Sequence, residues 1–517
     1  MKSLVTLLAL LFLAVPCAAA PQSAGGEAKA LASFKKAFHP KKAAPVPARQ
    51  QALTSLASFG SAKVAEALVK AHADVETEIA ELAVLRNEHI AEIAQLEKGQ
   101  EFKEQRTFPQ AVIDRLNELK PRLARQRQEL DDLRKLGNDL RAQIGALRDP
   151  ESVRWLVQNV LGSKKYTLLL KLTVSEVAGS LSGELVKDLQ RVFQRAKRPE
   201  ELIALLKGMS FAGKEARAVA PQIIKLLEHK DEVVREHAAF ALSKLAVPEA
   251  IEPMIDLLER ETGRAKEHVA SALEILTRQK HGVLIASWRR WYADEKERLF
   301  EPDAPLGGGM FERSESKSDS GYYFDIAMDG KSILYIIDAS GSMKEEIELV
   351  LKDSKGEPKK DTRLAACKAE LMSALTRLES DAEFNVMWYA DIPRLFQDKM
   401  VKADKGNVTE GRAFVEKLVP NGYTNIYDSM KLAFELAGQG AKDRYYATGL
   451  DTIFLLTDGS PTTSDGKQDS TEKIIEAVRE WNVLGRIKIH AIGIGKNINT
   501  AFLQQLASEN GGEFRQY

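Results

Sequence analysis

The sequence has only two cysteines, Cys17 and Cys367. Because Cys17 falls in a segment that we expect to be removed, the mature chain has no internal disulfide and must be held together by packing. The sequence also lacks an excess of either charge, since 74 basic residues balance 74 acidic ones. No global field therefore favours nucleic acid, and we predict no nucleic-acid partner.

Long apolar runs are lacking beyond the first 20 residues. Lys2 precedes an apolar run at 4–15, and small residues follow at 17–20. The run is shorter than the roughly 20 residues of a spanning helix, and this order of segments is typical of a secretory signal peptide. Pro16, directly before Cys17, does not fit a lipoprotein cleavage site. We expect a signal peptide at 1–20 and an exported protein, periplasmic or secreted, without a transmembrane segment.

A chain of 517 residues is too long for one compact core, so we expect several domains. The segment 21–61 is rich in alanine, proline, glycine and lysine, and we predict a flexible tether there. Five basic residues in it have no acidic residue among them: Lys35, Lys36, Lys41, Lys42 and Arg49. A solvated linker is the simpler interpretation, and contact with an anionic cell-envelope polymer is the alternative.

Residues 62–149 have helical periodicity. The stretch 62–98 carries an apolar stripe with an eleven-residue spacing, formed by Ile79, Leu82, Leu85, Ile90, Ile93 and Leu96. After a break, a seven-residue repeat follows in two registers: Leu116, Leu123, Leu130, Gly137 and Ile144, and Leu119, Gln126, Leu133, Leu140 and Leu147. We predict an antiparallel helical hairpin, or coiled coil, that serves as a spacer or arm and offers a surface for self-association.

Residues 150–301 change to shorter helices. The stretch 218–242 resembles a HEAT repeat, and its segment Arg235-Glu236-His237-Ala238 is echoed by Lys266-Glu267-His268-Val269. Each helix pair of such a repeat buries only one face, so neighbours must stack. The N-terminal part is therefore predicted to be all-α, a coiled-coil hairpin followed by a HEAT-like α-solenoid.

Two groups of side chains in this array are of types that can form a site. Trp288, Trp291 and Tyr292 are interpreted as aromatic side chains that seal the last repeat, with a ligand platform as the alternative. His237 and His268 lack cysteine or carboxylate partners in ligand spacing, so they are a poor zinc signal.

A glycine-rich and serine-rich linker at 302–321 precedes the last unit, 322–517. There, strand and helix patterns alternate, which predicts a mainly parallel sheet with helices on both faces, a doubly wound α/β domain. Strands are expected at 322–327, with a turn at Asp329-Gly330, and at 333–337, 384–389, 452–456 and 487–494. Helices are expected at 364–378, 409–418, 426–436, 471–481 and 500–508. Ligands of such folds bind beyond the carboxyl ends of the strands.

The segment Asp338-Ala339-Ser340-Gly341-Ser342 follows the first buried strand and resembles the D-x-S-x-S signature of von Willebrand factor type A (vWA) domains. Thr424 fits that family's threonine, although Gly422-Tyr423 replaces the usual glycine pair, and Asp458 fits its third loop. The resemblance implies a metal-ion-dependent adhesion site. It implies direct coordination by Ser340 and Ser342, direct or water-mediated coordination by Thr424, and mostly water-mediated coordination by Asp338 and Asp458.

The donor types agree with this resemblance. Hydroxyl and carboxylate oxygens suit Mg²⁺, and Mn²⁺ can substitute. Such an ion would lack protein ligands on one side, where an Asp or Glu carboxylate of a protein partner completes the shell. No nucleophile or general base is recognised, and motifs of hydrolases and phosphotransferases are absent from the sequence. We therefore predict a non-enzymatic, metal-dependent adhesion protein.

Two other functions stay open at this point. In one, the HEAT-like repeats bind the partner, and the metal site is idle or only stabilises the fold; in the other, the chain is a hydrolase with an unrecognised site. The charged segment 344–361 is expected to influence which partner is admitted. The acidic stretch 465–469 is interpreted as a solvated loop, since it lacks the alternating ligands of a calcium loop.

Overall fold

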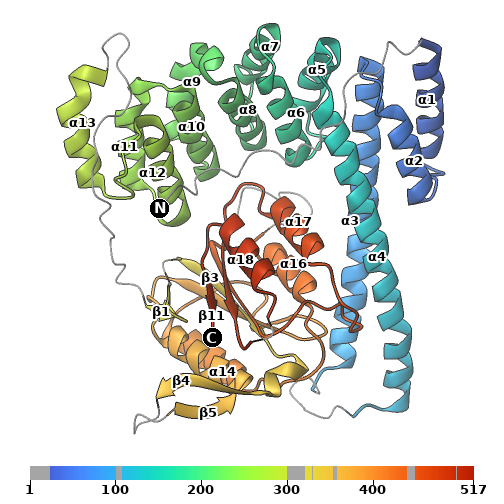
Figure 1. The fold of residues 1–517 in the computed structure, drawn as a ribbon, viewed down its shortest axis with the longest axis vertical. Helices are drawn as coiled ribbons and strands as arrows, with labels where there is room; N and C mark the ends of the chain where they lie inside the picture. Colours follow the sequence, from blue (N-terminus) through green and yellow to red (C-terminus); the bar gives the residue numbers. More distant parts are fainter. Residues whose placement is uncertain are drawn as a thin grey trace.

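The computed structural model describes residues 24–99, 107–299, 321–328, 330–352, 358–438, 449–496 and 498–517. A row of short helices and a long hairpin form an angle, and an α/β domain lies within it (Figure 1). The predicted signal peptide and nearly all of the predicted linker fall outside the described residues. Among the described helices, none combines the length and the apolar character that crossing a bilayer requires.

The prediction of a flexible tether was wrong for the described part of 21–61. Helices α1 (Ala24–Ala37) and α2 (Val46–Leu56) form there, and Phe34 and Leu56 are buried in the core of the helical part. The prediction interpreted the prolines as helix breaks. Pro45 instead occupies the N-cap position of α2 and Pro47 lies in its first turn, where the missing N–H has no partner to lose. Arg49 is buried and pairs with Glu78 at 2.8 Å, so it is not available to a polymer.

Helices α3 (Ala62–Leu96) and α4 (Gln110–Ala146) form the predicted antiparallel hairpin (Figure 1). Gly137 holds a heptad position that faces α3, and a Cβ there would make an ordinary contact with Val75 Cγ1 at 3.6 Å. Only part of the apolar stripe predicted on α3 is buried. Leu85 is 44% exposed, whereas its neighbour Arg86 is 3% exposed.

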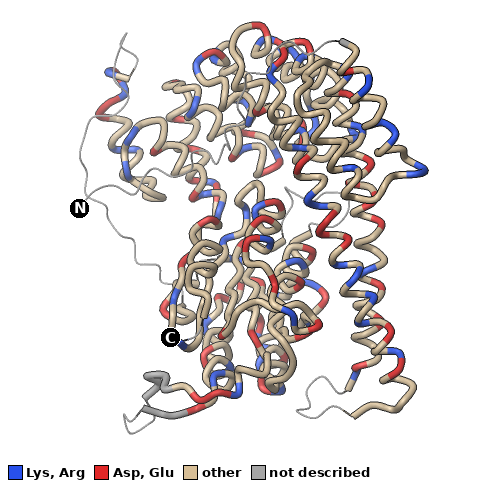
Figure 2. Tube along the Cα trace, turned by 45° about the vertical axis from the view of Figure 1, so that its right-hand side comes forward, with Lys and Arg blue, Asp and Glu red and all other residues tan. Residues whose placement is uncertain are grey.

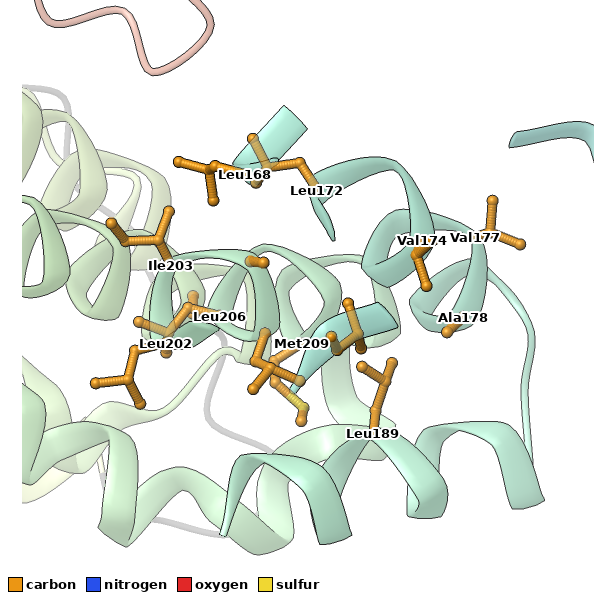
Figure 3. Packing of buried hydrophobic residues seen from close by; sticks show 14 of the residues in the cluster. Leu168, Leu172, Val174, Val177, Ala178, Leu189, Leu202, Ile203, Leu206 and Met209 are labelled. Carbon is orange, nitrogen blue, oxygen red and sulfur yellow. The ribbon is translucent and has the colours of Figure 1, made fainter. Parts of the chain in front are cut away.

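The short helices stack as a solenoid with the following bounds: α5 (Pro150–Leu156), α6 (Leu168–Ser180), α7 (Glu184–Phe193), α8 (Pro199–Ala212), α9 (Ala220–Lys225), α10 (Glu232–Leu245), α11 (Ile251–Arg260), α12 (Gly263–Thr277) and α13 (Ile285–Leu299). Leucines and valines of α6, α7 and α8 fill the space between them (Figure 3). Helices α6 and α8 touch backbone to backbone, since a Cβ on Gly179 would lie 2.1 Å from Gly208 O.

The aromatic group at the end of the array seals it, as predicted. Trp288 is fully buried, its Nε1 donates to Gly282 O at 2.8 Å, and its ring meets that of Trp291 edge-on at 6.0 Å. This burial favours the sealing role over a ligand platform. The two histidines also have local partners: His237 Nδ1 lies 2.9 Å from Val233 O, and His268 Nδ1 lies 2.5 Å from Glu236 Oε2.

The α/β domain is built on a sheet in the order β11-β10-β9-β3-β6-β7, with β8 also paired to β6. Its strands are β3 (Ser332–Asp338), β6 (Glu383–Tyr389), β7 (Arg394–Leu395), β8 (Val401–Lys402), β9 (Thr452–Thr457), β10 (Lys488–Gly493) and β11 (Phe514–Gln516). Strands β3, β6, β9, β10 and β11 are parallel, and β7 and β8 run antiparallel to β6. The predicted buried strands are confirmed as parallel neighbours.

Helices cover both faces of this sheet, as a doubly wound fold requires. Helices α14 (Arg363–Thr376) and α15 (Lys405–Glu416) pack on one face. Helices α16 (Ile426–Leu436), α17 (Thr471–Trp481) and α18 (Thr500–Glu509) pack on the other. Strand β3 therefore lies in the centre of the sheet and is buried from both sides.

Two small hairpins accompany the sheet. The expected single strand at 322–327 is instead folded back on itself as β1 (Tyr322–Tyr323) and β2 (Ile326–Ala327), because Phe324 and Asp325 adopt positive φ angles of 48° and 56°. The segment after the D-x-S-x-S motif forms β4 (Glu346–Lys352) and β5 (Pro358–Thr362), an antiparallel pair.

Charged side chains join the α/β domain to the helical hairpin. Residues of both signs line α3 and α4 along the side of the domain (Figure 2). Arg127 of α4 bonds to Asp469, and its guanidinium lies 4.8 Å from the ring centroid of Tyr427. Arg86 of α3 lies 3.5 Å from Asp428. All of these side chains except Tyr427 carry formal charge, and all are buried.

The solenoid contributes a second set of contacts. Arg486, before β10, bonds to the buried Glu236 of α10, and Lys488 Nζ lies 2.9 Å from Glu267 of α12. Burying ions is costly unless each is paired, and here each has its partner. The domain is thus held in one orientation by matched charges from both helical units.

Candidate metal centre

Three predicted motifs meet at one edge of the sheet. Asp338 is the last residue of β3, and Asp458 directly follows β9, the parallel neighbour of β3. Thr424 lies just before α16, whose cap is Asn425. Because the carboxyl ends of parallel strands share one edge, the fold brings these residues together.

Asp338 is fully buried and held by hydrogen bonds. Its Oδ1 accepts from the backbone N of Ser340 at 2.8 Å. Its Oδ2 accepts from Thr457 Oγ1 at 2.8 Å and from Tyr389 OH at 3.2 Å. Sequence reasoning missed Thr457 and Tyr389, although both are polar residues at the ends of apolar strands beside β3.

The two serines connect the first motif to the third. Ser340 Oγ lies 3.1 Å from Ser342 Oγ, and Ser342 Oγ donates to Asp458 Oδ1 at 2.8 Å. Ser340 and Asp458 are 1% and 3% exposed, so this cluster is largely shielded from water. Four of the five predicted residues thus share one continuous set of oxygen atoms.

Thr424 joins them through its loop. Gly341 N donates to Gly422 O at 3.0 Å, and Asn421 N donates to Ala339 O at 2.8 Å, so this loop lies against the first motif. A Cβ on Gly459 would lie 3.7 Å from Thr424 Oγ1, which places the hydroxyl beside the third motif. The structure therefore brings all five predicted residues together at this edge of the sheet.

Burial disfavours the ionised forms of both carboxyl groups, those of Asp338 and Asp458. Burial, together with the nearby charge of Asp458, raises the pKa of Asp338 to about 7. Burial also raises the pKa of Asp458. Two carboxylates that have lost water and repel each other are stabilised by a cation between them.

One protein cation already contacts the cluster, and sequence reasoning missed it. Arg363 Nη1 donates to Asp458 Oδ2 at 2.9 Å, and its Nη2 lies 2.6 Å from Glu345 Oε2. Arg363 is the first residue of α14, where the helix dipole disfavours positive charge. A basic residue at a helix start was the signal that could have revealed it.

The donor set fits a hard divalent cation. The cluster offers two carboxylates and three hydroxyls, and it has no sulfur or imidazole donor, which is the set that Mg²⁺ or Mn²⁺ prefers. Within the described residues, no group of three or more His, Cys, Asp or Glu is placed to hold a metal. The oxygen donors around Asp338 are thus of the type that a hard divalent cation takes.

The loop at 465–469 differs from its prediction. Asp465 and Lys467 pair with each other at 3.0 Å, but Asp469 is only 8% exposed because it contacts Arg127. The loop is thus solvated at one end and docked at the other. Such a contact between distant segments leaves no trace in local sequence.

Known families match both parts of the chain. The model described as "von Willebrand factor type A domain" matches residues 332–515, and the model described as "HEAT repeats" matches residues 189–274. The inter-alpha-trypsin inhibitor heavy chain H4 of Bos taurus is 27% identical over 220 residues, which are 41% of this chain and 21% of that protein. The chain spans about a fifth of the length of the curated relatives it matches.

Solved structures are similar to the same region. A von Willebrand factor type A structure from Catenulispora acidiphila is 20% identical, with a TM-score of 0.29, covering 37% of this chain and 40% of that one. Proximal thread matrix protein 1 of the mussel byssus, with zinc in its MIDAS motif, is 21% identical, with a TM-score of 0.25, covering 36% and 41%. The C-terminal part of this chain is a von Willebrand factor type A domain, preceded by HEAT repeats.

Proposed function

We propose that this chain is an exported, non-enzymatic adhesion protein whose vWA domain binds a protein partner through an exposed Asp or Glu. The observation that carries the proposal is the convergence of Asp338, Ser340, Ser342, Thr424 and Asp458 at one sheet edge. Mg²⁺, when held there, supplies positive charge and a free coordination position for a carboxylate.

The residues have separate parts in this proposal. Ser340, Ser342 and Thr424 present neutral oxygens, while Asp338 and Asp458 supply the negative charge that attracts a cation. Thr457 and Tyr389 hold Asp338 in place through hydrogen bonds at 2.8 and 3.2 Å. The hydroxyl of Ser342 donates to Asp458, and in this proposal both oxygens serve the cation and not a covalent step.

A capture experiment tests the proposal. Beads that carry an Asp-containing peptide should retain the full chain in Mg²⁺, release it in EDTA, and retain it again when Mg²⁺ is restored. Beads with the matching Asn peptide should retain none, and Ser342→Ala should bind to neither. Ser163→Ala, on an exposed loop of the solenoid, is the matched control and should behave like the wild type. Retention that EDTA leaves unchanged would contradict the proposal.

A second candidate function is favoured by one patch on the solenoid. Phe211 of α8 is 43% exposed, and Lys207 Nζ lies 5.3 Å from its ring centroid and 5.8 Å from that of Phe240. Lys244 lies 5.3 Å from the Phe240 ring. An acidic protein segment could bind here without metal. In that case capture would survive EDTA and be lost in Phe211→Ala.

A further inference from the structure

We infer that Tyr423 is a second contact point for the partner, so that the domain selects an acidic residue that has an aromatic or aliphatic neighbour. The inference rests on the proposed function and specifies its ligand. Tyr423 directly precedes Thr424, and its side chain is 48% exposed. This residue also replaces the second glycine of the usual pair in the motif.

Contacts with neighbouring residues fix the position of the Tyr423 ring. The backbone N of Tyr423 donates to Asp391 Oδ1 at 2.8 Å. Gly466 has a φ of +83°, and a Cβ there would lie 2.5 Å from both Cε1 and Cζ of Tyr423. The ring therefore lies directly on the backbone of Gly466, and only glycine leaves room for it.

The support beneath the ring is itself ordered by hydrogen bonds. Thr463 N donates to Lys467 O at 2.7 Å, and Gly466 N donates to Thr463 O at 2.9 Å. The ring thus has one side on a closed turn and the other toward solvent. A rigid aromatic surface loses little entropy when a second side chain covers it.

This support is joined to the candidate metal centre. Thr462 N donates to Thr424 O at 2.8 Å, and Thr424 N donates to Thr462 Oγ1 at 2.8 Å. The turn, the ring and the Thr424 hydroxyl therefore belong to one connected unit. The ring of Tyr423 is thus fixed on the same loop as the Thr424 hydroxyl, one residue away.

The charges near the ring favour an apolar neighbour over an ionic one. Lys467 and Asp465, on the turn beneath the ring, pair at 3.0 Å and neutralise each other. Glu345, near the oxygen cluster, is exposed but paired with Arg363, so the ring of Tyr423 is an exposed apolar surface among paired charges. A side chain next to the partner's carboxylate would gain by stacking on it, as aromatic pairs do.

Two peptide probes test the inference on the full chain, one with Phe and one with Gly beside a single Asp. In Mg²⁺ the wild type should bind the Phe peptide about fivefold more tightly, as stacking on an aromatic ring predicts. Tyr423→Ala should bind both peptides equally, with unchanged Mg²⁺ affinity by calorimetry. Tyr423→Phe should keep the preference. Tyr322→Ala, at a residue that is 44% exposed on β1, is the matched control.

The outcomes separate the inference from the proposed function. A preference for the Phe peptide that persists in Tyr423→Ala overturns the inference alone. Loss of Mg²⁺ binding in Tyr423→Ala shows that the residue only holds its loop, which also overturns the contact role. If the wild type binds neither peptide in a Mg²⁺-dependent way, the proposed function fails and the inference fails with it.

Discussion

Arg127 of α4 and Asp469 of the loop before α17 form a buried ion pair, although 342 residues separate them in sequence. Asp469 lies on the loop that also carries Asp458, a residue of the candidate metal centre. The same loop carries Thr462, which accepts a hydrogen bond from Thr424 N. The helical hairpin is therefore attached to the same loop that builds one side of the site. This makes the hairpin part of the architecture around the site and more than a spacer.

Removing one partner of this pair should destabilise the protein strongly. We expect Arg127→Met to lower the free energy of unfolding by about 3 kcal/mol, because it leaves a buried carboxylate that has lost its arginine and keeps Lys473 at 3.7 Å. Denaturant unfolding measures the change. Lys187→Met, which removes an exposed pair with Glu184, should leave the free energy of unfolding nearly unchanged, because solvent screens that pair. Equal effects of the two variants would contradict the buried contact.

Lys431 should make stability depend on pH. Burial, together with the charges of Arg86 and Arg134, lowers its pKa to about 7 against the attraction of Glu435 and Asp428. The unfolded chain keeps the ordinary pKa near 10.5, so it binds more protons than the folded chain between these values. The free energy of unfolding therefore rises as pH increases from 7 toward 10.5.

The matched variant for this effect is Lys431→Met. Between pH 7 and pH 9 the wild type should gain about 2 kcal/mol more stability than the variant does. Urea unfolding at several pH values measures both profiles. If the two profiles run parallel, Lys431 is not buried as a destabilised cation.

Arg363 should weaken cation binding, since its guanidinium takes one oxygen of Asp458 and repels a second cation. We expect Arg363→Gln to bind Mg²⁺ about tenfold more tightly than the wild type. Arg377→Gln, at an exposed residue that follows the same helix and pairs with Glu370, should leave the affinity unchanged. Weaker binding in Arg363→Gln would mean that the arginine mainly positions Asp458.

Helices α6 and α8 approach each other so closely at Gly179 that we expect no side chain to fit there. We expect Gly179→Ala to lower the free energy of unfolding by about 2 kcal/mol, because its Cβ would lie 2.1 Å from Gly208 O. Gly162→Ala is the control, since a Cβ there meets nothing within 4 Å. Thermal unfolding followed by circular dichroism compares them. A neutral Gly179→Ala would show that the helices are farther apart.

The local hydrophobic pattern was sufficient to predict the strands and the helix that carry the candidate metal centre. Strands β3 and β9 are buried on both faces, so continuous apolar runs predicted them, and the motif residues Asp338 and Asp458 follow directly at their ends. Helix α16 was predicted at its observed bounds because a polar cap precedes an apolar period. The convergence of the motifs followed from the parallel order of the strands.

Features that depend on distant partners were missed. Arg86 is buried and Leu85 exposed because α3 faces a charged surface of the vWA domain, which hydrophobic periodicity does not show. Helix α2 was missed because Pro45 and Pro47 were interpreted as breaks although they begin it. Arg363 was missed because its partner Asp458 lies on another loop. Each error arose where a tertiary contact or a cap outweighed composition.

Calorimetric titration of Mg²⁺ into the purified chain tests the central claim most directly, that Asp338, Ser340, Ser342, Thr424 and Asp458 hold one divalent cation. The wild type should bind one Mg²⁺ per chain with a single affinity, and Ser342→Ala should lose that binding while keeping its fold by circular dichroism. Absence of Mg²⁺ binding to the wild type, or equal binding by Ser342→Ala, would contradict the claim.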